Sequence, residues 1–143
     1  MSDKIEENKE KGWEVPWIHG PDWQQMILVV SKSCSTIQRR DEVRQSAGRI
    51  RELYGELEEP LNLLCSSTCP SCEEVGCKRA TVWYDQRDLL FYYLQFDTFP
   101  ERQITKSSIG FCSHLGPMGC KISRPERPFI CTWYVCPAQG EKI

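Results

Sequence analysis

The chain has 143 residues, near the commonest size of a single domain, so we expect one compact domain. Hydrophobic residues make up 40% and charged residues 27%, which argues against a disordered chain, and no apolar run approaches the roughly 18 residues that span a bilayer. The net charge of −2 argues against a nucleic-acid partner, because domains that bind nucleic acid are usually basic.

The polarity of the chain suggests its organisation. Residues 1–12 are mostly polar or charged, so we expect a flexible tail there rather than a secretory signal. Residues 13–143 are expected to form the single domain. We expect a small, mainly α-helical domain, in which residues 13–64 form a helical scaffold and residues 65–137 a cysteine-cluster region that binds metal. Residues 65–77, which are rich in Ser and contain Pro70 and Gly76, are expected to form a loop.

A first helix is predicted over residues 21–33, where apolar side chains recur at the spacing of one helical face. These side chains are Trp23, Met26, Ile27 and Val30. The aliphatic run within the segment is equally typical of a short buried strand, so both alternatives stay open.

A second helix is predicted over residues 36–59, where apolar residues step by four and three positions. The stripe consists of Val43, Ala47, Ile50, Tyr54 and Leu57. Ser35 and Gln38 have the spacing of a capping box before this helix. Pro60 is expected to end it, because proline has no backbone N–H for the helical ladder.

An aromatic segment follows over residues 82–96. We predict a helix over residues 86–96 with Asp85 as its cap, whereas a hairpin with its turn at Asp85 to Asp88 is the alternative. The aromatic side chains are expected to supply core, and a wall that binds substrate is the second interpretation. Farther on, a short strand is expected before Cys112, and a short helix is expected to stop before Pro137.

Nine cysteines are the most informative feature of the composition. Eight form two groups of four, and Cys34 stands alone as an expected buried, unreactive thiol. The first group is Cys65-x3-Cys69-x2-Cys72-x4-Cys77, and the second is Cys112-x7-Cys120-x10-Cys131-x4-Cys136. We predict a cytoplasmic protein, in which clustered cysteines are reduced and indicate metal ligands. Disulfides are the alternative if the compartment is oxidising.

Four thiolates can bind zinc as a tetrahedral site or hold an iron–sulfur cluster. Cys69-x2-Cys72 has the spacing of a zinc knuckle. The Cys-Pro steps at Cys69 and Cys136 instead resemble the surroundings of some iron–sulfur clusters. Both metals stay open, as does the question of which cysteines share one.

Other residues near the cysteines suit such a site. Gly76 and Gly119 precede cysteines and allow tight turns that aim backbone N–H groups at sulfur. His114 could replace a sulfur, although an exposed or capping role is the simpler interpretation. Basic residues beside the ligands could offset thiolate charge, and ordinary surface charge explains them equally well. They are Lys78, Arg79, Lys121, Arg124 and Arg127.

The segment from Cys112 to Pro137 resembles the signature half of the YkgJ-type cysteine-cluster family, a domain that chelates zinc or iron. The matching residues, in order, are Cys112, Leu115, Cys120, Ile122, Arg124-Pro125, Cys131 and Cys136. Family members carry eight cysteines in two groups, although the first group here lacks the adjacent cysteine pair of the family. The resemblance implies that all eight cysteines bind metal, and it implies no reaction.

Three functions are consistent with these patterns. The first is a metal-binding protein that carries an iron–sulfur cluster or zinc. The second is a structural zinc module that presents a surface to a protein partner, through Trp13, Trp17 and Trp23. The third is an enzyme in which a cluster with an open position meets a small substrate. The chain has no G-x-S-x-G, P-loop or H-E-x-x-H motif, so no catalytic residue is predicted.

Overall fold

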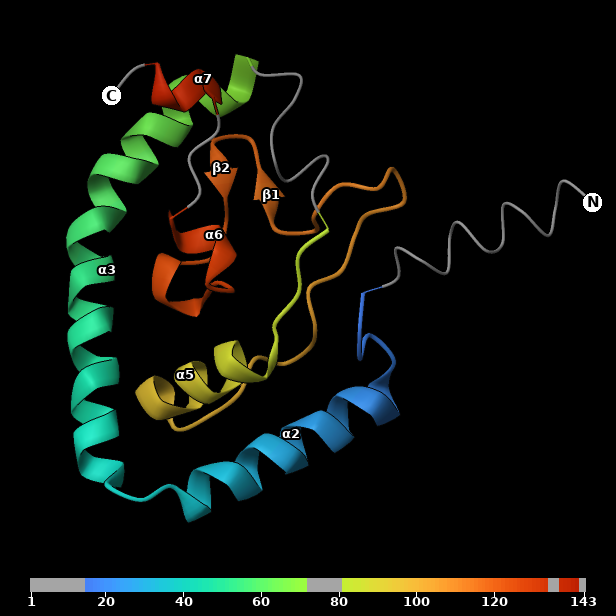
Figure 1. Cartoon of the computed structure of the whole chain (residues 1–143). Coiled ribbons are helices and arrows are strands. Elements are labelled where there is room, and N and C mark those ends of the chain that lie inside the picture. The colour runs from blue at the N-terminus through green and yellow to red at the C-terminus, as the bar shows by residue number, and fades with distance from the viewer. Residues whose placement is uncertain (1–14, 72–80, 134–136, 142–143) are drawn as a thin grey trace, which may run out of the picture.

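The computed structural model describes residues 15–71, 81–133 and 137–141, and it confirms a mainly helical fold. Two long helices run along two sides of the molecule, a third helix lies in the angle between them, and a small hairpin lies beside the longest helix (Figure 1). The longer helices are α2 (Gly20–Thr36), α3 (Arg40–Thr68) and α5 (Gln86–Phe96). The short elements are η1 (Cys69–Ser71), β1 (Leu115–Gly116), β2 (Gly119–Cys120), η2 (Arg124–Glu126), α6 (Ile130–Trp133) and α7 (Pro137–Gly140).

Helix α2 confirms the first predicted helix, and the strand alternative is wrong. His19 precedes it at the cap position, and Pro21 lies in its first turn, where a missing N–H costs nothing. The core joins α2 to α5 and the segments around α5. Its buried members are Trp23, Val30, Cys34, Tyr84, Leu89 and Ile104. Because Trp23 is only 3% exposed, the prediction that it contributes to a partner surface is wrong.

The entry into α3 differs from the predicted capping box. Ser35 lies within α2, and its hydroxyl donates to the Lys32 carbonyl oxygen at 2.7 Å. Arg39 instead precedes α3 with a left-handed backbone, at φ 57°, and makes no side-chain cap. The capping box at Ser35 and Gln38 is therefore wrong, because the first helix continues through the residue that was expected to cap the second.

Helix α3 also continues through Pro60 to Thr68, so the prediction that Pro60 ends it is wrong. The turns after Pro60 pack against η1, η2, β2 and α7. Proline in a helix interior costs about 3 kcal/mol because one ladder hydrogen bond is lost. These tertiary contacts offset that cost, and the helix therefore carries the scaffold directly into the cysteine region.

Helix α5 confirms both the predicted range and the predicted cap. The Asp85 side chain accepts from the Asp88 N–H at 2.9 Å, and the Asp88 side chain accepts from the Asp85 N–H at 2.9 Å. The hairpin alternative is wrong. Arg44 of α3 ties the other end of α5 in place, donating to the Asp97 carboxylate at 2.7 Å and to the Leu94 carbonyl oxygen at 3.3 Å.

The C-terminal third folds back beneath the end of α3 (Figure 1). Lys106 and Cys112 form an isolated bridge, where a short strand was expected. Strands β1 and β2 pair antiparallel, with Leu115 opposite Cys120. The expected short helix is present as α6. None of the helices in the described ranges combines the length and apolar character needed to cross a membrane.

Candidate functional site

Five of the eight predicted ligands lie within the described residues. They are Cys65, Cys69, Cys112, Cys120 and Cys131, and each is half-buried. The other three predicted ligands, Cys72, Cys77 and Cys136, lie outside the described residues, as do Gly76, Lys78, Arg79, Trp13 and the predicted tail.

Cys65 and Cys69 lie one helical turn apart at the end of α3. The Cys69 backbone N–H donates to the Cys65 carbonyl oxygen, so the two residues share one face of the helix. The prediction of a loop is therefore wrong for residues 65–71, because α3 and η1 extend regular structure through them. A helical turn fixes the separation of the two side chains, whereas a loop would leave it variable.

The β1–β2 hairpin approaches Cys65 through Gly119. A side chain added at Gly119 would place its Cβ 3.2 Å from the Cys65 Cβ, and the Gly119 backbone has φ 118°, which L side chains rarely adopt. The expectation of a glycine that permits a tight turn is confirmed here. The residue after this glycine is Cys120, so the hairpin brings the backbone next to one cysteine of the second group close to Cys65 of the first.

A buried amide from α7 joins the same end of α3. The Gln139 Nε2 lies 3.4 Å from the Cys65 Sγ, 3.8 Å from the Cys69 Sγ and 3.1 Å from the Thr68 Oγ1. Gln139 is 6% exposed and Thr68 is 7% exposed. One nitrogen therefore contacts both sulfurs of the first group that the structure describes.

The pKa of the Cys120 thiol is affected by burial and by nearby charged groups. Burial raises the pKa of its thiol, whereas Arg127 and Arg124 act in the opposite direction, and Cys112 adds to the rise. Burial also raises the pKa of Tyr84, with smaller contributions from nearby groups that include Cys131 and Cys120. Cys120 therefore interacts electrostatically with Cys112 and with Tyr84, and Cys131 also interacts with Tyr84.

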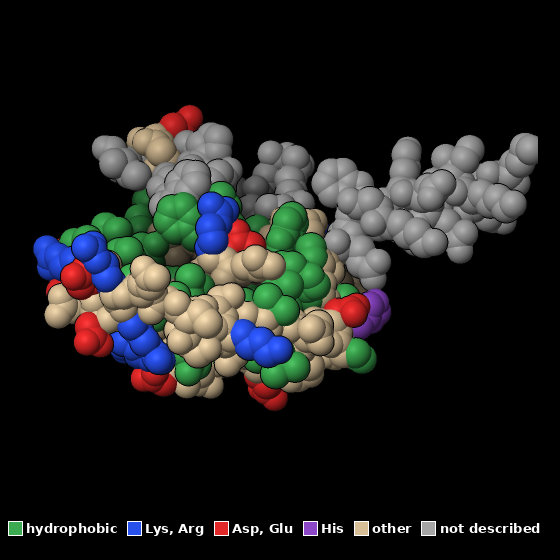
Figure 2. Space-filling model, turned by 60° about the horizontal axis from the view of Figure 1, so that its bottom comes forward, with side chains coloured by type: hydrophobic (Ala, Val, Ile, Leu, Met, Phe, Trp, Pro, Cys, Tyr) green, Lys and Arg blue, Asp and Glu red, His purple; other side chains and the backbone are tan. Residues whose placement is uncertain are grey.

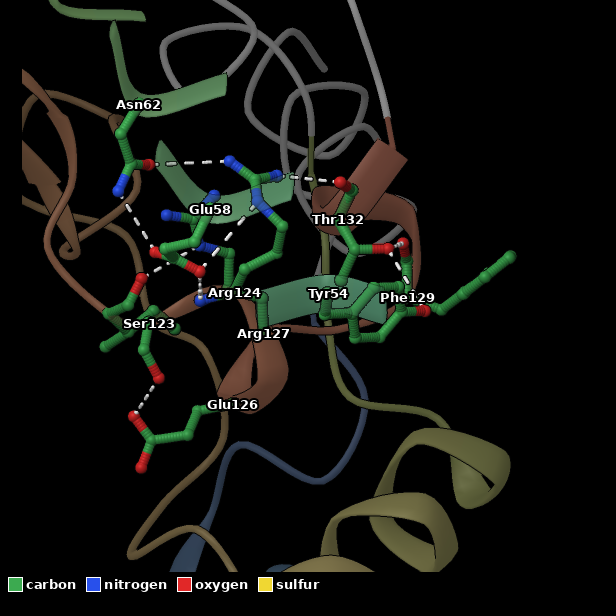
Figure 3. A network of polar contacts seen from close by, with 10 residues as sticks. Tyr54, Glu58, Asn62, Ser123, Arg124, Glu126, Arg127, Phe129 and Thr132 are labelled. Carbon is green, nitrogen blue, oxygen red and sulfur yellow. Dashed lines mark hydrogen bonds and ion pairs between the residues drawn. The ribbon is translucent and has the colours of Figure 1, made fainter. Parts of the chain in front are cut away.

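Arg124 is buried between α3 and the cysteine segment (Figure 3). Its Nη1 donates to the Thr132 carbonyl oxygen at 2.7 Å, and its backbone N–H donates to Glu58 at 3.0 Å. Its Nη2 lies 3.5 Å from the Asn62 Oδ1, and its Nε lies 4.0 Å from the Glu58 carboxylate. Burial lowers the pKa of Arg124, with Arg127 acting in the same direction, while Glu58, Cys65 and Cys120 oppose this change.

The basic residues near the cysteines divide into two kinds. Arg124 and Arg127 are only 3% and 8% exposed, and the Arg127 Nε donates to the Ile122 carbonyl oxygen at 2.8 Å. Lys121 is exposed, as ordinary surface charge would be. The two arginines are therefore part of the interior, and their positive charges face the region that contains Cys65 and Cys120.

The described residues alone do not complete a metal site. Within residues 15–71, 81–133 and 137–141, no three Cys, His, Asp or Glu side chains lie close enough together to hold a metal ion. His114 is half-buried, and burial lowers its pKa, with Arg102 and Lys121 acting in the same direction. A complete four-ligand site would need sulfurs from outside these ranges, or closer approach of the five cysteines described.

Cys34 belongs to the hydrophobic core and not to this region. It is 1% exposed, and burial raises the pKa of its thiol. The prediction of a lone buried thiol is confirmed. An inert thiol of this kind is packed as a small apolar side chain.

An apolar groove of about 750 Å³ lies between α3, α5 and the segment that leads into α6. Its aromatic lining includes Tyr54, Trp83, Phe91 and Phe129, so the aromatic segment supplies both core and groove wall. Phe129 is 62% exposed at its edge. On the face shown in Figure 2, acidic and basic side chains are intermixed with apolar ones.

Three residues around the cysteines were not predicted from the sequence. Glu58 and Asn62 precede Cys65 on α3 by seven and three positions, so they lie on its helical face. That periodicity is a usable signal once α3 is known to continue through Pro60. Gln139 is a single glutamine near the C-terminus, and nothing in its sequence context indicates a role.

Comparison of the chain with models of protein families, with curated proteins and with solved structures gave no match. The resemblance of residues 112–137 to the YkgJ-type family therefore stays a prediction. The arrangement of residues around the end of α3 is the basis for assigning a function.

Proposed function

We propose that this protein binds a thiophilic metal through its two groups of cysteines, as zinc or as an iron–sulfur cluster. The observation that carries the proposal is the convergence at the end of α3. Cys65 and Cys69 share one helical face, and the turn at Gly119 brings the hairpin of Cys120 against Cys65. The backbone of Gly119, one residue before Cys120, thus lies close to Cys65, although the two cysteines are 55 positions apart in the sequence.

The charge around these cysteines supports the proposal. Four thiolates around Zn²⁺, or around a doubly charged [4Fe–4S] core, leave a net charge of about −2. The guanidinium groups of Arg124 and Arg127 are buried nearby, where a low dielectric strengthens their attraction to anionic sulfur. We also propose that the protein functions in the cytoplasm, where thiols stay reduced.

The test is metal and acid-labile sulfide analysis of protein purified without oxygen, with an absorption spectrum of the same sample. We expect either about two zinc ions per chain without colour, or iron with equivalent sulfide and a broad band near roughly 400 nm. Cys65→Ser and Cys120→Ser should reduce the metal content. Cys34→Ala is the matched control and should leave it unchanged, because Cys34 lies in the core. Metal-free protein, or thiols already consumed in disulfides, would overturn the proposal.

The apolar groove favours a second candidate, in which the domain presents a surface to a protein partner. Exposed aromatic groups that line a concave apolar surface are typical of binding sites. Substituting Phe129→Ser should lower the fluorescence of a bound hydrophobic dye. The control Ile109→Ser should not, because Ile109 is 70% exposed and lies outside the groove lining. Equal dye binding by wild type and Phe129→Ser would count against this candidate.

A further inference from the structure

The C-terminal helix α7 crosses the end of α3 (Figure 1) and places one buried amide on the cysteines. The Gln139 Nε2 has three acceptors within reach, namely Thr68 Oγ1 at 3.1 Å, Cys65 Sγ at 3.4 Å and Cys69 Sγ at 3.8 Å. The Thr68 hydroxyl donates to the Leu64 carbonyl oxygen at 2.8 Å, so its oxygen accepts from the amide. An amide nitrogen carries two hydrogens, so it can donate to Thr68 and to a sulfur at the same time.

The strength of the hydrogen bond from Gln139 depends on whether the sulfurs are neutral thiols or anionic thiolates. The sulfur of a neutral thiol is a weak acceptor, whereas a hydrogen bond to an anionic acceptor is roughly twice as strong as a neutral one. Gln139 is 6% exposed, so its N–H groups have given up most of their contact with water. The buried amide is therefore best satisfied when Cys65 and Cys69 are thiolates, the form in which cysteine binds metal.

We propose that Gln139 is a positioning residue for the metal site, which donates N–H···S hydrogen bonds to the Cys65 and Cys69 thiolates. The inference rests on the proposed metal binding and adds a residue that no cysteine pattern contains. Groups that hydrogen-bond to metal ligands fix the orientation of those ligands, and their loss typically weakens metal binding 10–100-fold. Gln139 also joins α7 to α3, so the same contact fastens the C-terminal helix over the sulfurs.

The test is a titration of the full chain with Co²⁺, followed by the sulfur-to-cobalt charge-transfer absorption. Gln139→Met keeps the approximate length of the side chain and removes the donor. We expect a 10–100-fold weaker Co²⁺ affinity and a shifted charge-transfer band. Thr68→Val is the matched control, because it removes the hydroxyl that Gln139 also contacts but leaves the amide–sulfur contacts. It should change the affinity much less than Gln139→Met does.

A second variant, Gln139→Glu, keeps the shape of the side chain and faces the sulfurs with a carboxylate, so it should weaken binding at least as much as methionine. Circular dichroism of each variant confirms that the helices are present. Wild-type affinity and an unshifted band in both Gln139 variants would overturn this inference and leave metal binding intact. Wild-type protein that binds no Co²⁺ would overturn the proposed function itself, so the two failures are distinguishable. Equal losses in Thr68→Val and Gln139→Met would show that the amide acts through Thr68 and would also overturn it.

Discussion

Substituting Gly119→Ala should destabilise the protein substantially. Two costs combine at this position. The backbone has φ 118°, and holding a non-glycine residue in such a conformation costs about 1–3 kcal/mol. The new Cβ would also lie 3.2 Å from the Cys65 Cβ, whereas carbon atoms in good contact lie about 3.5–4.0 Å apart.

The Cys65 Cβ, which an added side chain at Gly119 would meet, cannot easily move. The Cys65 Cβ is attached directly to the backbone of α3, so relief requires a shift of the helix or of the hairpin. Overpacking of this kind costs about 1–3 kcal/mol, and the two costs together predict a loss of about 2–6 kcal/mol in the free energy of unfolding. The same shift separates Cys65 from Cys120, so we also expect weaker Co²⁺ binding.

The assay is urea unfolding followed by circular dichroism, with two glycine controls that separate the costs. Gly110 has φ 84° and nothing within 4 Å of an added Cβ, so Gly110→Ala carries the backbone cost alone. Gly48 lies within α3 with open space around it, so Gly48→Ala should stabilise by about 0.5–1 kcal/mol. If Gly119→Ala and Gly110→Ala lower the free energy of unfolding by the same amount, the close contact between the hairpin and Cys65 does not exist, and the reasoning fails.

Two further predictions concern the cap of α5 and the buried arginine. Burial acts to raise the pKa of Asp85, but the hydrogen bond from the Asp88 N–H and the charge of Arg87 outweigh it, so the pKa is lower than usual. The ionised Asp85 side chain therefore stabilises the folded protein above about pH 4, and this stabilisation is lost as the pH falls through the lowered pKa. Asp85→Ala should lower the free energy of unfolding by about 1 kcal/mol at pH 7. Asp85→Asn keeps a capping side chain, and its free energy of unfolding should approach that of wild type as the pH falls below 4. A difference in urea unfolding that stays constant over this pH range would contradict the assignment. Arg124→Met should cost about 3 kcal/mol, because the Thr132 carbonyl oxygen loses its donor and the Glu58 carboxylate loses the nearby positive charge. Arg124→Lys should recover only part of this loss. Thermal unfolding that matches wild type in both variants would argue against a structural role for the guanidinium.

Local sequence signals predicted the scaffold well. The cap at Asp85 and the helix after it follow from side chains and backbone groups three residues apart, so nothing distant is needed to specify them. The capping box at Ser35 failed for a related reason. The same serine can serve as a cap or donate to a carbonyl oxygen within a helix, and the packing of α2 decides between the two.

The end of α3 shows why the site was harder to predict. Proline has a strong local preference against helix interiors, and only packing with β2, η2 and α7 overrides it. With the helix taken through Pro60, Glu58, Asn62, Cys65 and Cys69 recur at intervals of four, three and four residues and share one face. The approach of Gly119 and Gln139 depends on contacts across more than 50 positions, which no local pattern in one sequence contains.

Helix α3 is continuous in shape, but Pro60 divides it into two parts that are stabilised by different contacts. Pro60 has no N–H, so the ladder of backbone hydrogen bonds is interrupted between Glu56 and Pro60. The turns before this gap contact α5, through Tyr54 against Phe91 and Arg51 against Phe96, and the turns after it contact the hairpin and α7 through Cys65 and Thr68. If the cysteines bind metal as proposed, we expect the amide hydrogens of the last two turns to exchange with solvent as a separate cooperative unit, whose protection depends on metal binding more than on unfolding of the scaffold.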